Sequence, residues 1–575
     1  MKMKNIINYL GLLAIVSLLV MACKDEFLDG PAQGVLDQST LGNPDGVEGT
    51  LIAAYSLLDG FGGFGSWGSA GSNWIWASVA SDDAYKGSEA GDQQPTTDVE
   101  LYQWGTTGAD GYLNDKWRVL YDGINRANST INLLATVDAI GDADRQRIRG
   151  EAIFLRAHYH FDAWKIWENV PYYRETDTDF RKSNTAEDAL AAVIADLKEA
   201  ASLLPATQGD IGRVTSWTAR AYLGRALAHG ASKNLGGATW AEVKSTLDAV
   251  VNGGPYALND CFHTIFSVSG ENSAEMVLAY QSSVNDGEGN GENGNWADRL
   301  NFPHGGSPFG CCGFHQPSQN LVNAYKVDAS GLPMFGTFND ADVTAADAVD
   351  PRLDWTVGRD DVPFLNHGIH TPNWIRDRAW AGPYSPKKNI YHAGQGESSN
   401  VGWNSTHLTS LNLHILRYSD VLLTLAEAEV EAGSLERARE LVNMVRSRAG
   451  NCAQGPGSGV EDIAVPINDP SITWANYQVS TYDSPWSDQA AARQAVRMER
   501  RLELAMEGHR FFDLRRWGLA EQVLNDYLAV EKTKRQYLTG SAGYTGRNNL
   551  YPLPSVQIEL SRVDGEDRLQ QNSGW

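Results

Sequence analysis

Cysteine is scarce in this chain, and its spacing excludes the common zinc sites. The 575 residues contain five cysteines, at positions 23, 261, 311, 312 and 452. No two of them are separated by the two to four residues that are typical of zinc-ligand pairs. The sequence also lacks the His-Glu-x-x-His pattern of zinc hydrolases. We therefore predict neither a metal site nor a cofactor.

Basic residues are also few. The chain has 47 Lys and Arg against 71 Asp and Glu, which gives a formal net charge of −24. Such an acidic surface argues against nucleic acid and against anionic lipid headgroups as partners. It also disfavours highly sulfated polymers, unless a local basic patch overrules the overall charge.

Long apolar runs are absent except near the N-terminus. Residues 10–22 are almost entirely apolar, but the run is too short to span a bilayer. Because it follows Lys2 and Lys4, the segment is typical of a signal peptide. The run ends in LVMAC at residues 19–23, which resembles a bacterial lipobox. The alternative is an ordinary signal peptide with an incidental cysteine.

The lipobox pattern predicts that residues 1–22 are removed and that Cys23 is acylated, for example with palmitate. Two or more acyl chains anchor a protein stably. Residues 23–45 would then form a lipidated tether. The sequence KDE at residues 24–26 resembles the export signal of surface lipoproteins. We expect a protein anchored in the outer membrane and exposed at the cell surface.

Helical periodicity dominates the rest of the chain. Ile148, Ala152, Leu155 and Tyr159 form one apolar stripe. A capping box at residues 185–188 predicts the start of another helix, which Pro205 ends. Further helices are predicted at residues 413–432, at 435–449 between Ser434 and Gly450, and at 488–508. Paired helices of this length suggest degenerate repeats of the tetratricopeptide type.

Two regions differ in composition. Segments near 60–115 and 285–410 contain long stretches rich in Gly, Pro, Asn, Asp and Trp. These stretches predict long loops, which in a compact domain are usually functional. The predicted organisation is a single domain over residues 46–575, in which a helical scaffold carries loop-rich insertions. A rigid scaffold with elaborate loops is a binding architecture.

The aromatic residues of these loops are candidate ligand contacts. Sugar rings present flat C–H faces that pack on aromatic rings. The alternative for each residue is a loop anchor packed on its own scaffold. Arg378 and Arg376 flank the third aromatic loop and are able to bind vicinal hydroxyls or a carboxylate, with a loop salt bridge as the alternative. The candidate glycan-binding residues are Trp67, Trp296, Phe309, Trp374, Arg376, Trp380 and Tyr384. Trp117, Trp164, Trp217 and Trp517 lie in helical patterns and are predicted to be core residues.

Cys311 and Cys312 are adjacent, which is unusual. In an oxidising compartment they can close a vicinal disulfide, whose small ring is a rigid apolar plate. We add both to the candidate glycan-binding residues as a sugar platform. Separate bridges to Cys261 and Cys452, or free thiols, are the alternatives.

No pair of residues stands out as catalytic. The run at residues 499–516 interleaves carboxylates with arginines at helical spacing, which favours a structural ion-pair network. A glycoside hydrolase needs two carboxylates on either side of the scissile bond, and no such pair is identifiable. We predict that the protein is not an enzyme. A scaffold for assembling other proteins is another alternative, which predicts no small ligand.

Several segments together resemble the SusD/RagB family of outer-membrane lipoproteins. The most extensive is ERRLELAMEGHRFFDLRRWG at residues 499–518. The others occur in family order and comprise Cys23 with FLD at 27–29, SDDAYKG at 81–87, GEAIFLRA at 150–157, VP at 170–171, DPRL at 350–353, LRYSDVLL at 416–423, AEA at 426–428, YPLP at 551–554 and QNSGW at 571–575.

This resemblance implies a mainly α fold, in which four helical-repeat pairs carry a large irregular half. It also implies a partner, a SusC-like TonB-dependent barrel in the outer membrane, for which the protein is a hinged lid that captures nutrients. Most members of the family bind oligo- or polysaccharides and some bind peptides. We therefore expect a glycan-binding lid, with a peptide-binding lid as the alternative.

Overall fold

The computed structural model describes residues 41–60, 67–283, 293–395, 409–456 and 465–575. The predicted signal peptide, Cys23 and most of the predicted tether lie outside the described residues. None of the described helices has the length and apolar character needed to cross a bilayer.

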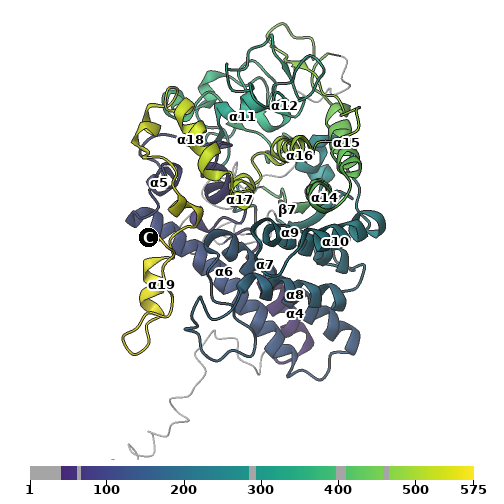
Figure 1. The fold of residues 1–575 in the computed structure, drawn as a ribbon, viewed down its shortest axis with the longest axis vertical. Helices are drawn as coiled ribbons and strands as arrows, with labels where there is room; N and C mark the ends of the chain where they lie inside the picture. Colours follow the sequence, from purple (N-terminus) through teal and green to yellow (C-terminus); the bar gives the residue numbers. More distant parts are fainter. Residues whose placement is uncertain (1–40, 61–66, 284–292, 396–408, 457–464) are drawn as a thin grey trace, which may run out of the picture.

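A continuous series of packed helices forms the scaffold (Figure 1). Five of them pack in chain order, namely α6 (Thr107–Leu134), α7 (Asp142–Trp167), α8 (Ala189–Leu203), α9 (Ser216–Lys233) and α10 (Trp240–Gly253). Distant parts of the chain then continue the series with α14 (Tyr418–Ala432), which packs on α10, and with α15 (Leu435–Asn451) and α16 (Gln489–Leu504). Taken in order, these helices form four pairs and confirm the predicted mainly α fold. The third pair, α10 with α14, is split by more than 150 residues.

Four local predictions need correction. Asp188 caps α8 by accepting bonds from the backbone N–H groups of Leu190 and Ala191, so the capping box expected at residues 185–188 was wrong. Residues 413–417 form a strand instead of the first turns of α14. The helix expected over 488–508 ends at Leu504, and α17 (Arg510–Arg516) follows it. Gly450 lies inside the last turn of α15, whereas Ser434 caps its start as predicted.

The remaining chain has short elements joined by long loops. Its strands form two-stranded ladders, namely β1 (Ala84–Gly87) with β3 (Phe314–Pro317), β2 (Met276–Tyr280) with β7 (Leu413–Arg417), β4 (Ala348–Val349) with β8 (Asn476–Tyr477), and β5 (Val357–Gly358) with β6 (Ser385–Pro386). The β4–β8 pair is parallel and the others are antiparallel. The other helices are α4 (Pro44–Tyr55), α5 (Gln94–Glu100), α11 (Gln319–Ala324), α12 (Leu353–Thr356), α13 (Arg378–Ala381), α18 (Ala520–Glu531) and α19 (Ser555–Leu560). Single turns are η2 (Trp67–Ser69), η3 (Trp74–Val79), η4 (Phe262–Phe266), η5 (Val268–Gly270), η6 (Pro372–Trp374), η8 (Gln536–Gly540) and η9 (Gly546–Asn549).

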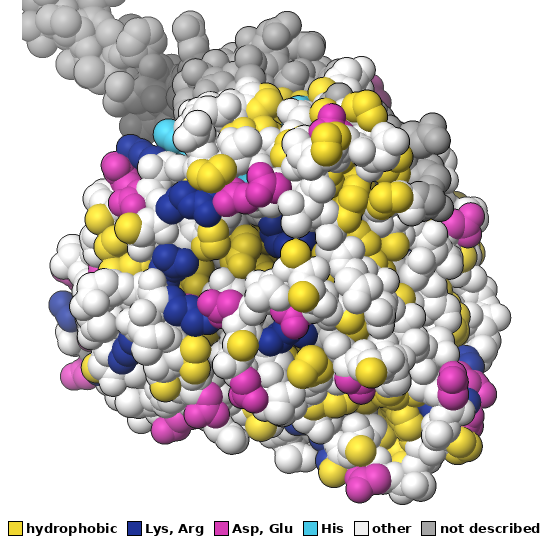
Figure 2. Space-filling model, turned by 90° about the horizontal axis from the view of Figure 1, so that it is seen from above, with side chains coloured by type: hydrophobic (Ala, Val, Ile, Leu, Met, Phe, Trp, Pro, Cys, Tyr) yellow, Lys and Arg dark blue, Asp and Glu magenta, His cyan; other side chains and the backbone are white. Residues whose placement is uncertain are grey.

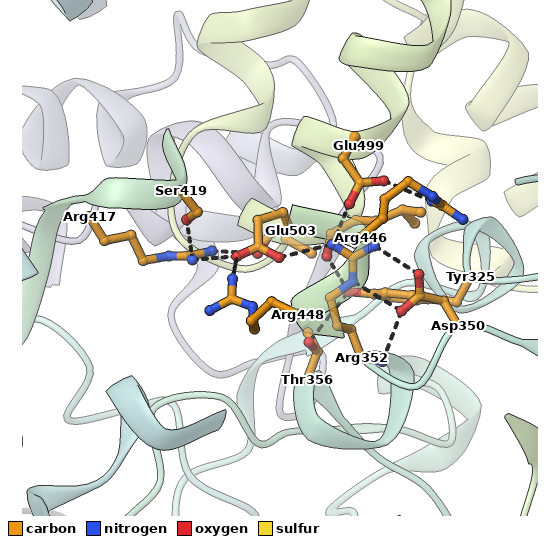
Figure 3. A network of polar contacts seen from close by, with 12 residues as sticks. Tyr325, Asp350, Arg352, Thr356, Arg417, Ser419, Arg446, Arg448, Glu499 and Glu503 are labelled. Carbon is orange, nitrogen blue, oxygen red and sulfur yellow. Dashed lines mark hydrogen bonds and ion pairs between the residues drawn. The ribbon is translucent and has the colours of Figure 1, made fainter. Parts of the chain in front are cut away.

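A buried ion-pair network joins the scaffold to the loop-rich half (Figure 3). Glu503 on α16 accepts from Arg417 at 2.5 Å, from Arg352 at 2.9 Å and from Arg448. Arg352 also donates to Glu499 at 2.7 Å, and all of these side chains are almost fully buried. Buried charges of this kind must be paired, because an unpaired ion in the interior is costly. The predicted structural role of the charged run at residues 499–516 is confirmed.

Candidate functional site

Three loops converge beside the β1–β3 ladder. The backbone N–H of Ser88, just after β1, donates to the carbonyl of Gly313 at 2.5 Å. The N–H of His304 donates to the carbonyl of Trp374 at 2.8 Å. Gly313 in turn donates to Phe302 at 2.8 Å. Residues 88–92, 295–313 and 373–376 are therefore joined to one another, and we call them the loop cluster.

Arg376 ties two of these loops together. Its guanidinium donates to Asp92 and to Glu89, each at 2.7 Å, and to the hydroxyl of Ser88 at 3.1 Å. About a third of the Arg376 side chain is exposed, and Glu89 is more exposed still. Such half-exposed ion pairs contribute little to stability. They leave donors and acceptors at the surface, where a ligand hydroxyl can reach them.

Lys86 holds the backbone of the loop at residues 88–92. Its ammonium group donates to the carbonyls of Glu89 and Asp92 at 2.6 and 2.7 Å. Burial lowers the pKa of Lys86 to about 8, although the nearby carboxylate of Glu100 opposes the shift. The lysine thus holds the backbone that carries the two carboxylates facing Arg376.

The four described cysteines form two bridges. Cys311 is bonded to Cys312, and Cys261 to Cys452. Of the alternatives left open by the sequence, the vicinal disulfide is the one formed. Cys312 is buried and Cys311 is half-buried within the loop cluster, next to the exposed Gly310. Its use as a sugar platform remains a prediction.

Trp67 and Trp296 stack on each other, with ring centroids 4.4 Å apart. The backbone N–H of Trp296 donates to the carboxylate of Asp59 at 2.9 Å. The guanidinium of Arg299 lies 4.9 Å from the centre of the Trp296 ring. Trp296 is only 9% exposed, whereas Trp67 is half-buried. The pair therefore offers a ligand mainly the ring of Trp67.

Two other candidates lie inside a hydrophobic core. Phe309 is 2% and Trp374 is 6% exposed, and both belong to a buried cluster with Phe364. The ring of Trp374 lies 5.3 Å from that of Phe364 in an edge-to-face arrangement. Phe309 and Trp374 therefore pack as loop anchors, which was the alternative to a direct ligand contact. Their packing in this buried cluster holds the loops that carry them in place.

The last two aromatic candidates, Trp380 and Tyr384, lie outside the loop cluster. Trp380 stacks on Tyr537 at 4.0 Å between centroids, and Lys86 lies 5.2 Å from its ring centre. The Tyr384 hydroxyl donates to Gln319 at 3.0 Å. Both side chains are half-buried. Arg378 lies 2.7 Å from Asp360, so Arg378 and Arg376 both form the loop salt bridges that were their alternative.

Sequence reasoning did not identify Ser88, Glu89, Asp92 and His304 as neighbours of the site. Residues 88–92 are far from His304 in the chain, and the β1–β3 ladder and the contacts of the 373–376 loop bring them together. The SDDAYKG motif, which ends at residue 87, was the one available signal. Figure 2 shows the upper face of the molecule, where Lys, Arg and acidic side chains surround a hollow with a hydrophobic floor.

Among the described residues, no three His, Cys, Asp or Glu side chains are grouped as they would be to bind a metal ion. The loop cluster instead combines an apolar disulfide with the exposed polar groups of Arg376, Glu89 and Asp92. This combination suits a ligand with both an apolar face and hydroxyl groups.

Comparisons with known proteins agree with this architecture. A SusD-like protein of Bacteroides ovatus is 25% identical over 457 residues, which cover 76% of this chain and 75% of that protein. A SusD-like protein of Formosa agariphila is 23% identical over 475 residues, which cover 78% of each chain.

Solved structures share the fold. A laminarin-binding SusD-like protein is 21% identical with a TM-score of 0.64, over 93% of this chain and all of that one. Surface glycan-binding protein A from Bacteroides thetaiotaomicron, solved with laminarihexaose, is 19% identical with a TM-score of 0.65, over 92% and 99% of the two chains.

Two family models match the sequence. One is described as starch-binding and associating with the outer membrane, and it matches residues 70–227. The other, the SusD family, matches residues 274–575, which is more than half of the chain. The chain belongs to the SusD family.

Proposed function

We propose that this protein is a surface lipoprotein that captures an oligo- or polysaccharide and acts as the lid of a SusC-like TonB-dependent barrel. Family membership supports the lid role. The description of the second family model supports starch-like ligands and an outer-membrane location. The fold shared with proteins named for laminarin and laminarihexaose supports a glycan.

The loop cluster is the observation that carries the glycan assignment. It contains both the Cys311–Cys312 disulfide and the half-exposed Arg376, Glu89 and Asp92. A sugar ring has apolar C–H faces and a polar rim, so it requires both kinds of surface at once. We assign the ligand contacts to this cluster and to the exposed parts of Trp67, Trp380 and Tyr384.

The proposed action is binding and closure without bond cleavage. Neither matching family model describes an enzyme. The carboxylates of the 499–516 run form ion pairs with arginines. Glu499 pairs with Arg352, and Glu503 pairs with Arg417. Cys23 is the proposed point of lipid attachment, which would keep the protein next to its barrel.

Calorimetry on the soluble chain beginning at Lys24 tests the proposal. The protein is titrated with laminarihexaose, with other neutral oligosaccharides and with a peptide mixture. We expect saturable heat with one glycan class, weakened at least tenfold in Arg376→Ala or Trp67→Ala. Phe180→Ala is the matched control, because Phe180 is an exposed aromatic residue on the helical half.

Saturable heat with the peptide mixture alone would change the proposed ligand from a glycan to a peptide. Equal weakening in Phe180→Ala would disprove the assignment to the loop cluster. Co-purification of the lipidated protein with a barrel from detergent-solubilised outer membranes tests the lid role. Recovery of the protein without any barrel under those conditions would count against it.

A further inference from the structure

A cavity lies on another part of the molecule, away from the loop cluster. It has a volume of about 630 Å³ and lies between α16, α18 and the loop at residues 336–340. None of its lining residues belongs to the loop cluster. The residues that matter here are Phe338, Asn339, Gln494, Arg497, Trp517 and Asp526.

A row of arginines borders this cavity. Arg493, Arg497 and Arg501 follow one another at four-residue steps on α16 and therefore share one face. Arg493 is paired with Glu431 through two bonds of 2.5 and 2.9 Å. Arg501 is paired with Asp82 at 3.0 Å.

Arg497, between them, forms no ion pair and no hydrogen bond within the described parts of the chain. Its Nε atom is buried without an acceptor, which is uncommon and calls for an explanation. The guanidinium group lies 4.9 Å from the centre of the Trp517 ring. Trp517, predicted as core, is half-buried at the cavity wall.

The two acids that act on Arg497, Glu427 and Glu431, are already paired with other arginines. Glu427 accepts from Arg516 at 2.8 and 2.6 Å and from the indole N–H of Trp517 at 2.7 Å. Burial lowers the pKa of Arg497. For Arg516, burial has the same tendency, but Glu427 and Asp513 outweigh it and raise the pKa. Arg497 is therefore a half-buried cation that forms no ion pair with an acid among the described residues, although Glu427 and Glu431 lie near enough to oppose the lowering of its pKa.

The other lining groups indicate what kind of anion would fit. Asp526 and Asp340 also line the cavity and have no ion pairs among the described residues. They would repel a small free anion, but they accept hydrogen bonds from hydroxyl groups. Gln494 adds an amide, and Phe338 and Trp517 add apolar surface. A ligand that satisfies all of these groups has one negative charge, several hydroxyls and an apolar face.

We propose that this cavity is a second carbohydrate site, which takes a sugar unit bearing one carboxylate, such as a hexuronate, and that Arg497 receives that carboxylate. The planar guanidinium matches a carboxylate in a two-bond geometry. The inference rests on the proposed glycan-binding function and extends it to acidic glycans. It gives the protein one site for neutral sugar faces and another for an acidic unit.

Ligand-observed NMR and calorimetry on the chain from Lys24 test this assignment. The probes are sodium glucuronate, methyl glucoside, glucose 6-sulfate and laminarihexaose. We expect glucuronate to bind in preference to methyl glucoside, and its affinity to fall at least tenfold in Arg497→Met. Arg376→Ala, in the loop cluster, should leave glucuronate binding unchanged, and Arg497→Met should leave laminarihexaose binding unchanged.

The outcomes separate the two proposals. Laminarihexaose binding without glucuronate binding would overturn the second site and leave the proposed function standing. Glucuronate binding that depends on Arg497, without neutral glycan binding, would support the second site and remove the neutral site from the loop cluster. Tighter Arg497-dependent binding of glucose 6-sulfate would overturn the choice of a carboxylate.

Thermal unfolding distinguishes a ligand-binding role of Arg497 from a structural one. Met retains the packing on Trp517 and removes an uncompensated charge, so Arg497→Met should melt at the wild-type temperature or above it. Arg516→Met is the matched control and should melt several degrees lower, because it leaves Glu427 without its buried partner. A similar fall in Arg497→Met would overturn the proposal.

Discussion

The helical half and the loop-rich half are stabilised by different means. In residues 107–253, helices follow one another and each satisfies its own backbone, with caps such as Thr215 on α9 and Thr239 on α10. In residues 293–395, few backbone groups lie in regular elements. There, buried cations replace secondary structure as donors.

Two lysines illustrate this difference. Lys387 donates to the carbonyls of Pro363 and Asp354, and Lys388 donates to those of Glu503 and Ala505 at 2.9 Å. Burial lowers the pKa of Lys387 to about 7 and that of Lys388 to about 8. Lys387 thus satisfies a loop carbonyl at Pro363, and Lys388 satisfies carbonyls at the end of α16. The loop-rich half should therefore be the more sensitive to single polar substitutions.

The largest expected effect is at Glu503, on α16, because its ion pair with Arg352 joins the scaffold to the loop-rich half. Glu503→Gln removes the charge that three buried arginines share, and we expect it to lower the free energy of unfolding by about 3–5 kcal/mol. Glu151→Gln is the matched change in the helical half. It should lower the free energy by only about 1–3 kcal/mol, because its partners Arg147 and Arg213 are partly exposed to water, whereas the three arginines around Glu503 are buried. Urea denaturation measures both variants, and an equal loss in the free energy of unfolding for Glu503→Gln and Glu151→Gln would contradict the expected difference.

The two disulfides should differ strongly. Cys261 and Cys452 are 191 residues apart, and their bridge joins η4 to the end of α15. Replacing both by Ala should lower the free energy of unfolding by about 2–5 kcal/mol, because the unfolded chain regains freedom. Replacing both Cys311 and Cys312 by Ala should change it little, because their bridge closes no long loop. Thermal unfolding of the two double variants decides between these outcomes.

Acid should destabilise both halves through buried neutral histidines. Burial lowers the pKa of His158, on α7, and of His315, on β3, to about 3. The unfolded chain binds these protons near pH 6.5, so stability is full above that pH and falls as the pH drops further. Between pH 7 and 5 each histidine should remove about 2 kcal/mol. His158→Gln and His315→Asn should each flatten the slope, and an unchanged slope would refute the assignment.

The smallest effect on stability is expected at the loop cluster. Arg376→Ala breaks half-exposed ion pairs with Glu89 and Asp92, and should change the free energy of unfolding by less than about 1 kcal/mol. Arg437→Ala, at an exposed helical pair with Glu440, should be similar. Only the first should weaken glycan binding. A large loss of stability in Arg376→Ala would show that the arginine is structural.

The helices were predictable where the pattern is local. The stripe through Ile148 and Leu155 lies buried in α7, and Ser434 caps α15. The strand at residues 413–417 was missed because its partner, β2, is more than 130 residues earlier in the chain. The start of α8 was misplaced by a few residues because two acceptable capping residues, Thr185 and Asp188, lie close together. Local rules cannot choose between such neighbours.

The sequence by itself indicated helices such as α7 and α15, the structural nature of the 499–516 run and the family. These depend on periodicity and on order along the chain. Only the tertiary structure decided that Trp374 and Phe309 are covered, that Cys311 bonds to Cys312, and that the Nε atom of Arg497 is buried without an acceptor among the described residues. Exposure and pairing depend on which distant segments meet. A residue type indicates what a side chain can do, and its neighbours in space determine whether it is left free to do it.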